Sequence, residues 1–161
     1  MIKVIIYLLL VLCAVFSMFV VEHLGNMPSW YLQSVLFIRC IFVGVVGGVL
    51  YCLRAVYINK CVRKTWDKDW EVWYYLRPIA SGISGLVSCI FLKAGLLVLE
   101  AASNAEAIPF GYLAIAFIAG YNVDNFVKKL ESVALSVWGI GKSRASIDIE
   151  QNEQKTDPNQ P

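Results

Sequence analysis

Long apolar runs separated by short polar segments dominate this chain. Four of the runs are long enough, as helices, to cross the roughly 30 Å hydrocarbon layer of a bilayer. They predict membrane-spanning helices at residues 4–21, 32–57, 78–99 and 110–126. The fold class that the pattern predicts is therefore an all-α, polytopic membrane protein with four transmembrane helices.

The first run, residues 4–21, is also where a cleaved signal peptide would lie. Its apolar length exceeds the roughly 7 to 15 residues of a signal-peptide core. The segment from Glu22 to Asn26 lacks a small-residue cleavage site. We expect the first helix to be retained, with cleavage as the alternative.

Two shorter amphipathic helices are predicted beside the spans. In the loop at residues 60–77, three tryptophans recur at helical spacing, which is typical of a helix lying in the membrane interface. Pro78 is expected in the first turn of the third span, where its missing N–H needs no partner. After the fourth span an apolar stripe of helical period contains Phe126, Leu130, Val133 and Val137.

The last part of the chain differs in composition from the rest. Residues 141–161 contain few apolar side chains and no aromatic ring. Such a segment buries too little apolar surface to offset the entropy of ordering. We expect a four-helix transmembrane domain at residues 1–140 and a disordered tail at 141–161.

Small residues at four-residue spacing occur in the second and third spans. Gly44 and Gly48 lie one turn apart in the second, and Ser81 and Gly85 do so in the third. Faces of this kind let helices approach closely in lipid, where dispersion and weak hydrogen bonds hold them. We expect these residues to pack the two helices together within the chain, with a dimer interface as the alternative.

Positive charge is distributed asymmetrically over this topology. All of the 14 Lys and Arg residues except Arg39 and Lys93 lie on one side of the membrane, and the two loops on the other side have none. Positively charged loops remain in the cytoplasm. Both termini and the loop at residues 60–77 are therefore predicted to be cytoplasmic.

The loop at residues 60–77 combines cations with aromatic rings. Its simplest interpretation is an aromatic belt with cations that reach the headgroup layer, and the alternative is a specific lipid or partner site. The residues predicted to make these lipid or partner contacts are Lys60, Arg63, Lys64, Lys68, Trp66, Trp70 and Trp73.

Two cations fall inside predicted spans, where a charge costs about 2.5 to 3.5 kcal/mol at the helix centre. Arg39 and Lys93 each lie about two turns from the outer end of their span. Both can extend toward the outer surface, toward Glu22 or Glu100, or they line a wet outer vestibule.

Polar residues also gather at the inner end of the fourth span. Asn122 and Asp124 are the candidates for a water-filled inner entrance. The alternative is that Asp124 forms an ion pair with Arg77 or Lys128.

Composition excludes several functional classes. At 58% hydrophobic, the chain is more apolar than the roughly 45 to 50% of a soluble domain. The net charge of +2 is too small to indicate direct nucleic-acid binding. The 5 cysteines form no CxxC pair, and the single histidine, His23, is not part of any catalytic motif. We expect no enzyme activity, no cofactor and no metal site.

The segment from Trp73 to Leu130 resembles known proteins. Its features are Tyr75-Leu76-Arg77-Pro78 opening a helix with Gly82 and Gly85, followed by Ala116-Phe117-Ile118-Ala119-Gly120-Tyr121. In this order they resemble small bacterial multi-pass inner-membrane proteins. Some of those proteins are encoded beside phage-defence genes and damage the membrane as effectors. The resemblance transfers no site residue.

The resemblance and the small size together suggest a function. The expected protein is a multi-pass bacterial inner-membrane effector of antiviral defence, which a cytoplasmic regulatory protein holds silent. On release it would form a homo-oligomer and permeabilise or depolarise the lipid bilayer. The alternative is a structural or adaptor subunit that anchors a larger membrane complex or transporter.

Overall fold

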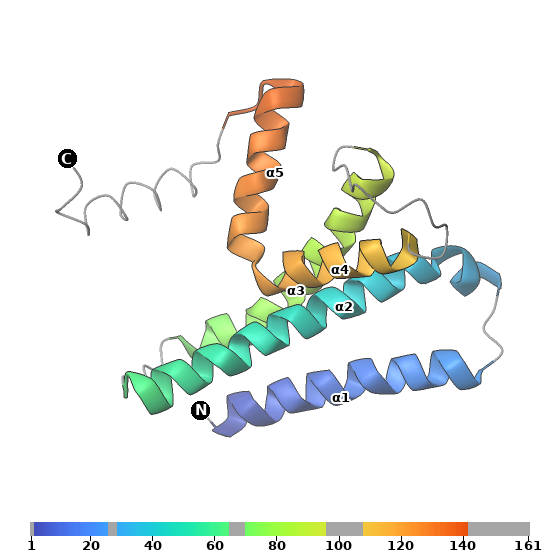
Figure 1. Ribbon diagram of the computed structural model, residues 1–161. Helices are drawn as coiled ribbons and strands as arrows, with labels where there is room; N and C mark the ends of the chain where they lie inside the picture. The colour runs from blue at the N-terminus through green and yellow to red at the C-terminus, as the bar shows by residue number, and fades with distance from the viewer. Residues whose placement is uncertain (1, 26–28, 65–69, 96–107, 142–161) are drawn as a thin grey trace, which may run out of the picture. The chain divides into compact units, whose positions relative to one another are not determined.

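The computed structural model describes residues 2–25, 29–64, 70–95 and 108–141. Within these ranges every regular element is a helix (Figure 1). The elements are α1 (Ile2–Leu24), α2 (Ser29–Tyr57), the π-helix η1 (Ile58–Val62), α3 (Glu71–Lys93), α4 (Ile108–Tyr121) and α5 (Val123–Trp138). The chain divides into two units, Met1–Val123 and Asp124–Pro161, and each is described by itself.

Three helical segments are long and apolar enough to cross a membrane: Ile2–Leu24, Ser34–Val62 and Glu71–Lys93. The shortest of them have 23 residues, which at 1.5 Å per residue is about 35 Å. This exceeds the roughly 30 Å of the hydrocarbon layer. The prediction of an all-helical chain that suits a membrane is confirmed for the described residues.

The fourth predicted span, residues 110–126, is interrupted. Helix α4 has 14 residues, or about 21 Å, and ends at Tyr121. Asn122 closes its last turn by donating from its backbone N–H to the carbonyl of Ile118 at 2.9 Å, and α5 begins at Val123. Asn and Asp side chains compete for backbone hydrogen bonds, which explains a break at this polar run. The four-span topology is therefore not confirmed.

Helix α3 begins earlier than predicted, at Glu71, so Pro78 lies inside the helix and not in its first turn. Residues 71–77, expected in a separate interfacial helix, belong to α3. Trp73 and Tyr74 pack against α2, and tertiary contacts of this kind decide helix ends more than propensity does. The rest of the predicted interfacial helix, residues 65–69, lies outside the described residues.

The far end of α3 also differs from the prediction. The helix ends at Lys93, where the expected span continued to residue 99. Ala94 donates to the carbonyl of Ile90 at 2.8 Å, and Gly95 follows with φ of +72°. A glycine in the left-handed region is the usual helix terminator, because it has no Cβ to clash. Residues 96–99 lie outside the described residues.

Glycines bring the backbones of α2 and α3 into contact. A Cβ at Gly44 would lie 2.6 Å from the carbonyl oxygen of Ser81 and 3.0 Å from the Cα of Gly85. A Cβ at Gly48 would overlap the hydroxyl of Ser81. The four residues predicted to pack these helices therefore lie at one interface, where only a hydrogen atom fits at Gly44.

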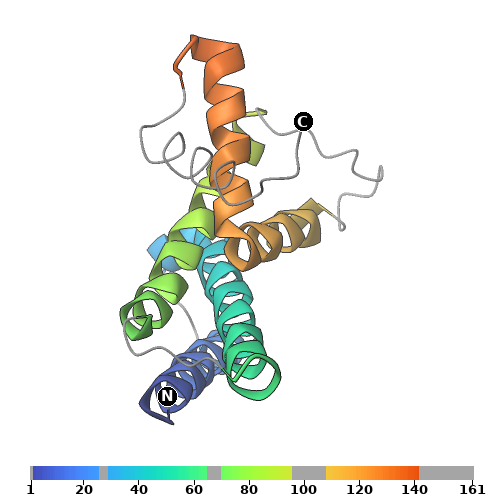
Figure 2. The same ribbon diagram turned by 90° about the vertical axis from the view of Figure 1, so that its left-hand side faces the viewer.

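Helix α4 meets α2 in the same manner. A Cβ at Gly47 would lie 2.5 Å from the carbonyl oxygen of Phe117, and a Cβ at Gly120 would overlap the carbonyl of Gly44. Gly44 thus faces α3 through its Cα and α4 through its carbonyl. The three helices α2, α3 and α4 meet backbone to backbone at this level (Figures 1 and 2).

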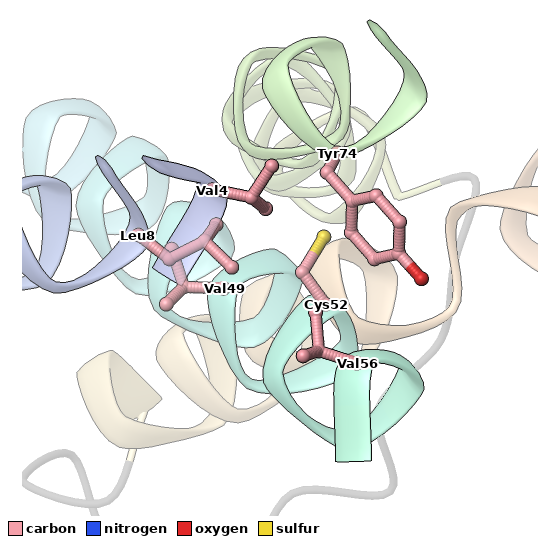
Figure 3. Close-up of a cluster of buried hydrophobic side chains, with 6 residues drawn as sticks. All are labelled: Val4, Leu8, Val49, Cys52, Val56 and Tyr74. Carbon is pink, nitrogen blue, oxygen red and sulfur yellow. The ribbon is translucent and has the colours of Figure 1, made fainter. Parts of the chain in front are cut away.

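Helix α1 contacts the rest of its unit through side chains. It runs antiparallel to α2 (Figure 1), and Val4 and Leu8, both fully buried, face α2 and α3. Figure 3 shows the cluster, which consists of Val4, Leu8, Val49, Cys52, Val56 and Tyr74. The hydroxyl of Tyr7 also donates to the carbonyl of Tyr75 at 3.3 Å.

Helix α5 is amphipathic, as its sequence stripe predicts. Phe126, Leu130 and Val133 are half-buried, whereas Lys128 and Lys129 are exposed. The last member of the predicted stripe, Val137, is exposed as well. Gly139, with φ of +68°, follows the helix end at Trp138. The predicted tail from residue 142 lies outside the described residues.

Candidate functional site

A pocket of about 230 Å³ lies where α2 passes into η1 and α3 begins. This end of the helices carries the predicted cytoplasmic loop, and we call the hollow the inner-end pocket. The residues that line it are Tyr51, Ala55, Ile58, Asn59, Arg63, Trp70, Trp73 and Tyr74. Four of its eight lining residues are aromatic, and Arg63 supplies a positive charge.

The π-helix η1 positions one side of the pocket. The N–H of Arg63 donates to the carbonyl of Ile58 at 2.9 Å, which is the wider i to i+5 bond of a π turn. Arg63 and Lys64 follow the turn, and the φ of 55° at Lys64 is unusual for a residue with a side chain. The amide of Asn59 donates to the hydroxyl of Tyr74 at 3.2 Å, which ties η1 to α3.

Arg77 contacts two of the aromatic residues that line the pocket and is only 5% exposed. Its guanidinium carbon is 4.6 Å from the ring centroid of Tyr51 and 5.2 Å from that of Trp73. Both distances suit cation–π attraction, which strengthens when the cation is shielded from water. Two rings that line the pocket therefore also contact a buried cation.

The aromatic cluster extends from the pocket to the end of α4. The rings of Tyr51 and Tyr121 meet edge to face with centroids 5.6 Å apart. Arg54 donates to the hydroxyl of Tyr121 at 2.8 Å. The last residue of α4 is thereby fixed near the C-terminal end of α2. Asn122, half-buried, follows at once, and Asp124 is exposed in the second unit.

Toward the other end of α2, Arg39 binds the carboxylate of Glu22. The Nη2 to Oε1 distance is 2.7 Å, and the Nε of Arg39 also donates to Oε1 at 2.8 Å. The side chain of Arg39 is 43% exposed and that of Glu22 is 11% exposed. Of the two partners expected for the in-span cations, Glu22 is the one that Arg39 contacts, and the bond joins α2 to α1.

Burial of Tyr31, near the start of α2, raises the pKa of its phenol, and the carboxylate of Glu22 raises it further. Tyr31 precedes the apolar segment Ser34–Val62. The surroundings of Tyr31 therefore favour the neutral, protonated form of its phenol.

Lys93 lies at the last residue of α3 and is exposed, not two turns inside a span. Its Nζ is 4.4 Å from the ring centroid of Phe37 on α2. The sequence placed Lys93 deeper because the apolar residues after it extended the predicted span. Because α3 ends at Lys93, with Ala94 as its C-cap, the charge of Lys93 is not buried within a span.

The predicted lipid or partner residues fall into three groups. Arg63, Trp70 and Trp73 line the inner-end pocket. Lys60, in η1, and Lys64, just after it, are exposed and do not line the pocket. Trp66 and Lys68 lie outside the described residues.

Several residues of the site were not predicted from the sequence. Tyr51, Asn59 and Tyr74 line the pocket, and Arg77 contacts two of its rings. A signal existed for Arg77, because a cation within an apolar helix usually has a specific environment. No sequence pattern marks Tyr51 or Asn59 as pocket residues, since their position depends on how α2, η1 and α3 meet.

The described residues do not contain a group of three or more His, Cys, Asp or Glu side chains that could hold a metal ion. Fold and site together define a helical protein suited to a membrane, with an aromatic and cationic pocket at one end. No protein-family model, curated protein or solved structure matches this chain.

Proposed function

We propose that this protein is a non-enzymatic inner-membrane effector of a bacterial antiviral defence system. It self-associates when a cytoplasmic partner releases it, and it then permeabilises or depolarises the membrane. The observation that carries the proposal is the apolar outward face of α3, which we call the α3 seam. Its exposed members are Val72, Leu76, Ile79, Ile83 and Ile90.

The α3 seam has the spacing of a helix–helix interface. Its members follow one another at alternating steps of four and three residues, with the half-buried Leu86 at the remaining position. Alternation of this kind lines up one face for knobs-into-holes packing. Ile79 and Ile83 are 58% and 59% exposed, whereas Ser81 and Gly85 on the other side are buried against α2. A second copy of the chain is the occupant that we assign to the seam.

Packing within one chain also favours assembly. At Gly44 the backbones of α2, α3 and α4 are in contact, which leaves no space for an ion between them. A conducting path would therefore form between copies and not through a single chain. Asn122, at the inner end of α4, is the polar candidate for lining such a path.

The proposed topology keeps α4 as a fourth crossing, with both termini in the cytoplasm. Tyr112, in the second turn of α4, packs in the cluster that includes Leu36 and Phe37 near the outer end of α2. Tyr121 reaches Arg54 near the inner end. The 14-residue helix α4, about 21 Å long, therefore lies along about half of the 29-residue apolar segment Ser34–Val62.

The function is tested by inducing the protein in bacteria while a dye reports the membrane potential. We expect depolarisation on induction, and protection from phage when the neighbouring genes are also present. The double variant Ile79→Ala and Ile83→Ala should retain expression and lose depolarisation. Ile6→Ala with Leu10→Ala is the matched control, since Ile6 and Leu10 are 52% and 64% exposed on α1. Unchanged potential and unchanged survival in every condition would contradict the proposal.

An adaptor subunit is the second candidate, because the α3 seam would also suit a helix of another membrane protein. A photo-crosslinking residue at Ile83 separates the two functions. Crosslinks between copies of this chain support the effector. A single different partner at fixed stoichiometry, without any change in permeability, supports the adaptor.

A further inference from the structure

One cation, Arg63, lines the inner-end pocket. The guanidinium carbon of Arg77, which is outside the lining, is 4.6 Å from the ring centroid of Tyr51 and 5.2 Å from that of Trp73. Among the described residues, none of those that line the pocket is acidic. An anion is therefore the ligand that the pocket favours.

The donors of the pocket suit a phosphate group. Arginine presents a planar fork of N–H groups that matches two phosphate oxygens. The amide of Asn59 has two N–H groups, one of which is used by Tyr74. Both residues lie on or next to the five-residue π turn η1, which holds them on the same side of the pocket.

The remaining walls suit the glycerol and first acyl carbons of a lipid. Ala55 and Ile58 are apolar, and Trp70 and Trp73 are the rings that concentrate at headgroup level in membrane proteins.

We infer that the inner-end pocket binds the phosphate-bearing headgroup of an anionic phospholipid. The lipid reaches the pocket from the bilayer, with its phosphate at Arg63 and Asn59 and its glycerol against the rings. The inference does not depend on whether the protein permeabilises membranes. The inference assigns lipid binding to one defined pocket, where the sequence suggested only a general contact between the basic loop and lipid headgroups.

The test uses the purified full-length protein in nonionic detergent and isothermal titration calorimetry. The probes are short-chain phosphatidylglycerol, phosphatidylcholine of the same chain length, and inorganic phosphate. We expect phosphatidylglycerol to bind at least about tenfold more tightly than phosphatidylcholine, because only the former has a net charge for Arg63. Inorganic phosphate should compete only at about 100-fold higher concentration, since it lacks the apolar contacts.

Two variants in the same turn decide whether the site is specific. Arg63→Gln should weaken phosphatidylglycerol binding by about tenfold, since it removes a charge-assisted hydrogen bond. Lys60→Gln removes the same charge from an exposed residue outside the pocket lining and should change binding by less than about threefold. Arg63 is exposed as well, so neither variant should change the thermal unfolding of the protein.

Three results would overturn the inference. Equal losses for Arg63→Gln and Lys60→Gln would show diffuse surface charge. Equal affinities for phosphatidylglycerol and phosphatidylcholine would show that the pocket does not select an anionic headgroup. Competition by inorganic phosphate at the concentration of the lipid itself would assign the pocket to a soluble phosphate compound.

Discussion

Helix α2 has two kinds of interface, and they differ in what holds them. Toward α3 and α4 its glycines allow backbone contact, with only a hydrogen atom at Gly44 facing Ser81 and Gly85. Toward α1 the contact consists of side chains, chiefly Val4 and Leu8 at one end. The remainder of α1 exposes many large apolar residues, among them Leu10 and Phe16.

The difference follows from the solvent. Between membrane helices there is no gain from expelling water, because lipid tails are as apolar as leucine side chains. Attraction comes from dispersion, which falls steeply with distance, so the closest interface is the strongest. We therefore regard α2, α3 and α4 as the stable part of the unit and α1 as the helix that separates first.

The largest effect is expected at the glycine interface. Gly44→Ala places a Cβ where the carbonyl of Ser81 would be 2.6 Å away, so a backbone must move. We expect the free energy of unfolding to fall by about 3 kcal/mol, at the upper end of overpacking effects. Unfolding in detergent measures it. Gly141→Ala, at a residue with nothing within 4 Å, is the control and should leave stability unchanged.

A smaller effect is expected at the α1 interface. Leu8→Ala removes a fully buried side chain that packs with Val49 and Cys52. Comparable changes in water-soluble cores cost about 2 to 5 kcal/mol. Here we expect about 1 kcal/mol, since the leucine in a separated helix meets lipid and not water. Leu10→Ala, at a residue 64% exposed, is the control. An effect as large as that of Gly44→Ala would contradict the ranking of the two interfaces.

The ion pair between Arg39 and Glu22 should contribute less. Its arginine is 43% exposed, so solvent weakens the attraction. A double-mutant cycle with Arg39→Gln and Glu22→Gln should give a coupling of about 0.5 to 1 kcal/mol. Proteolysis of the segment between α1 and α2 offers a second readout. A coupling of zero would show that the pair does not help to hold α1.

The smallest effect concerns alkaline pH. Burial raises the pKa of Tyr31 above its ordinary value of about 10. The unfolded chain loses this proton at lower pH than the folded protein does, so stability is constant below about pH 10 and falls above it. Tyr31→Phe should reduce the slope of stability against pH above pH 10. An unchanged slope would show that other groups cause the loss.

Much of the fold could be predicted because spans and close-packing faces are encoded locally. Apolar length predicts the helices, and the spacing of Gly44, Gly48, Ser81 and Gly85 gives the residues that meet between α2 and α3. Helix ends were less predictable. Pro78 suggested a start, but contacts of Trp73 with α2 extend α3 to Glu71.

The inner-end pocket shows a similar limit. The cations and tryptophans of its rim are visible in the sequence as a basic aromatic loop. The pocket itself depends on the π turn at Ile58–Val62 and on the buried position of Arg77. A π turn has no simple residue pattern, and the burial of an arginine depends on which rings lie beside it in space. Such features come from tertiary packing and not from periodicity.

The central claim is that copies of this chain associate through the α3 seam and make a bilayer leaky. The most direct measurement is the decay of a potassium diffusion potential across liposomes that contain the purified protein. We predict rapid decay with the wild-type chain and a stable potential with the Ile79→Ala and Ile83→Ala double variant. Equal decay for both, or a stable potential for the wild-type chain at every protein concentration, would contradict the claim.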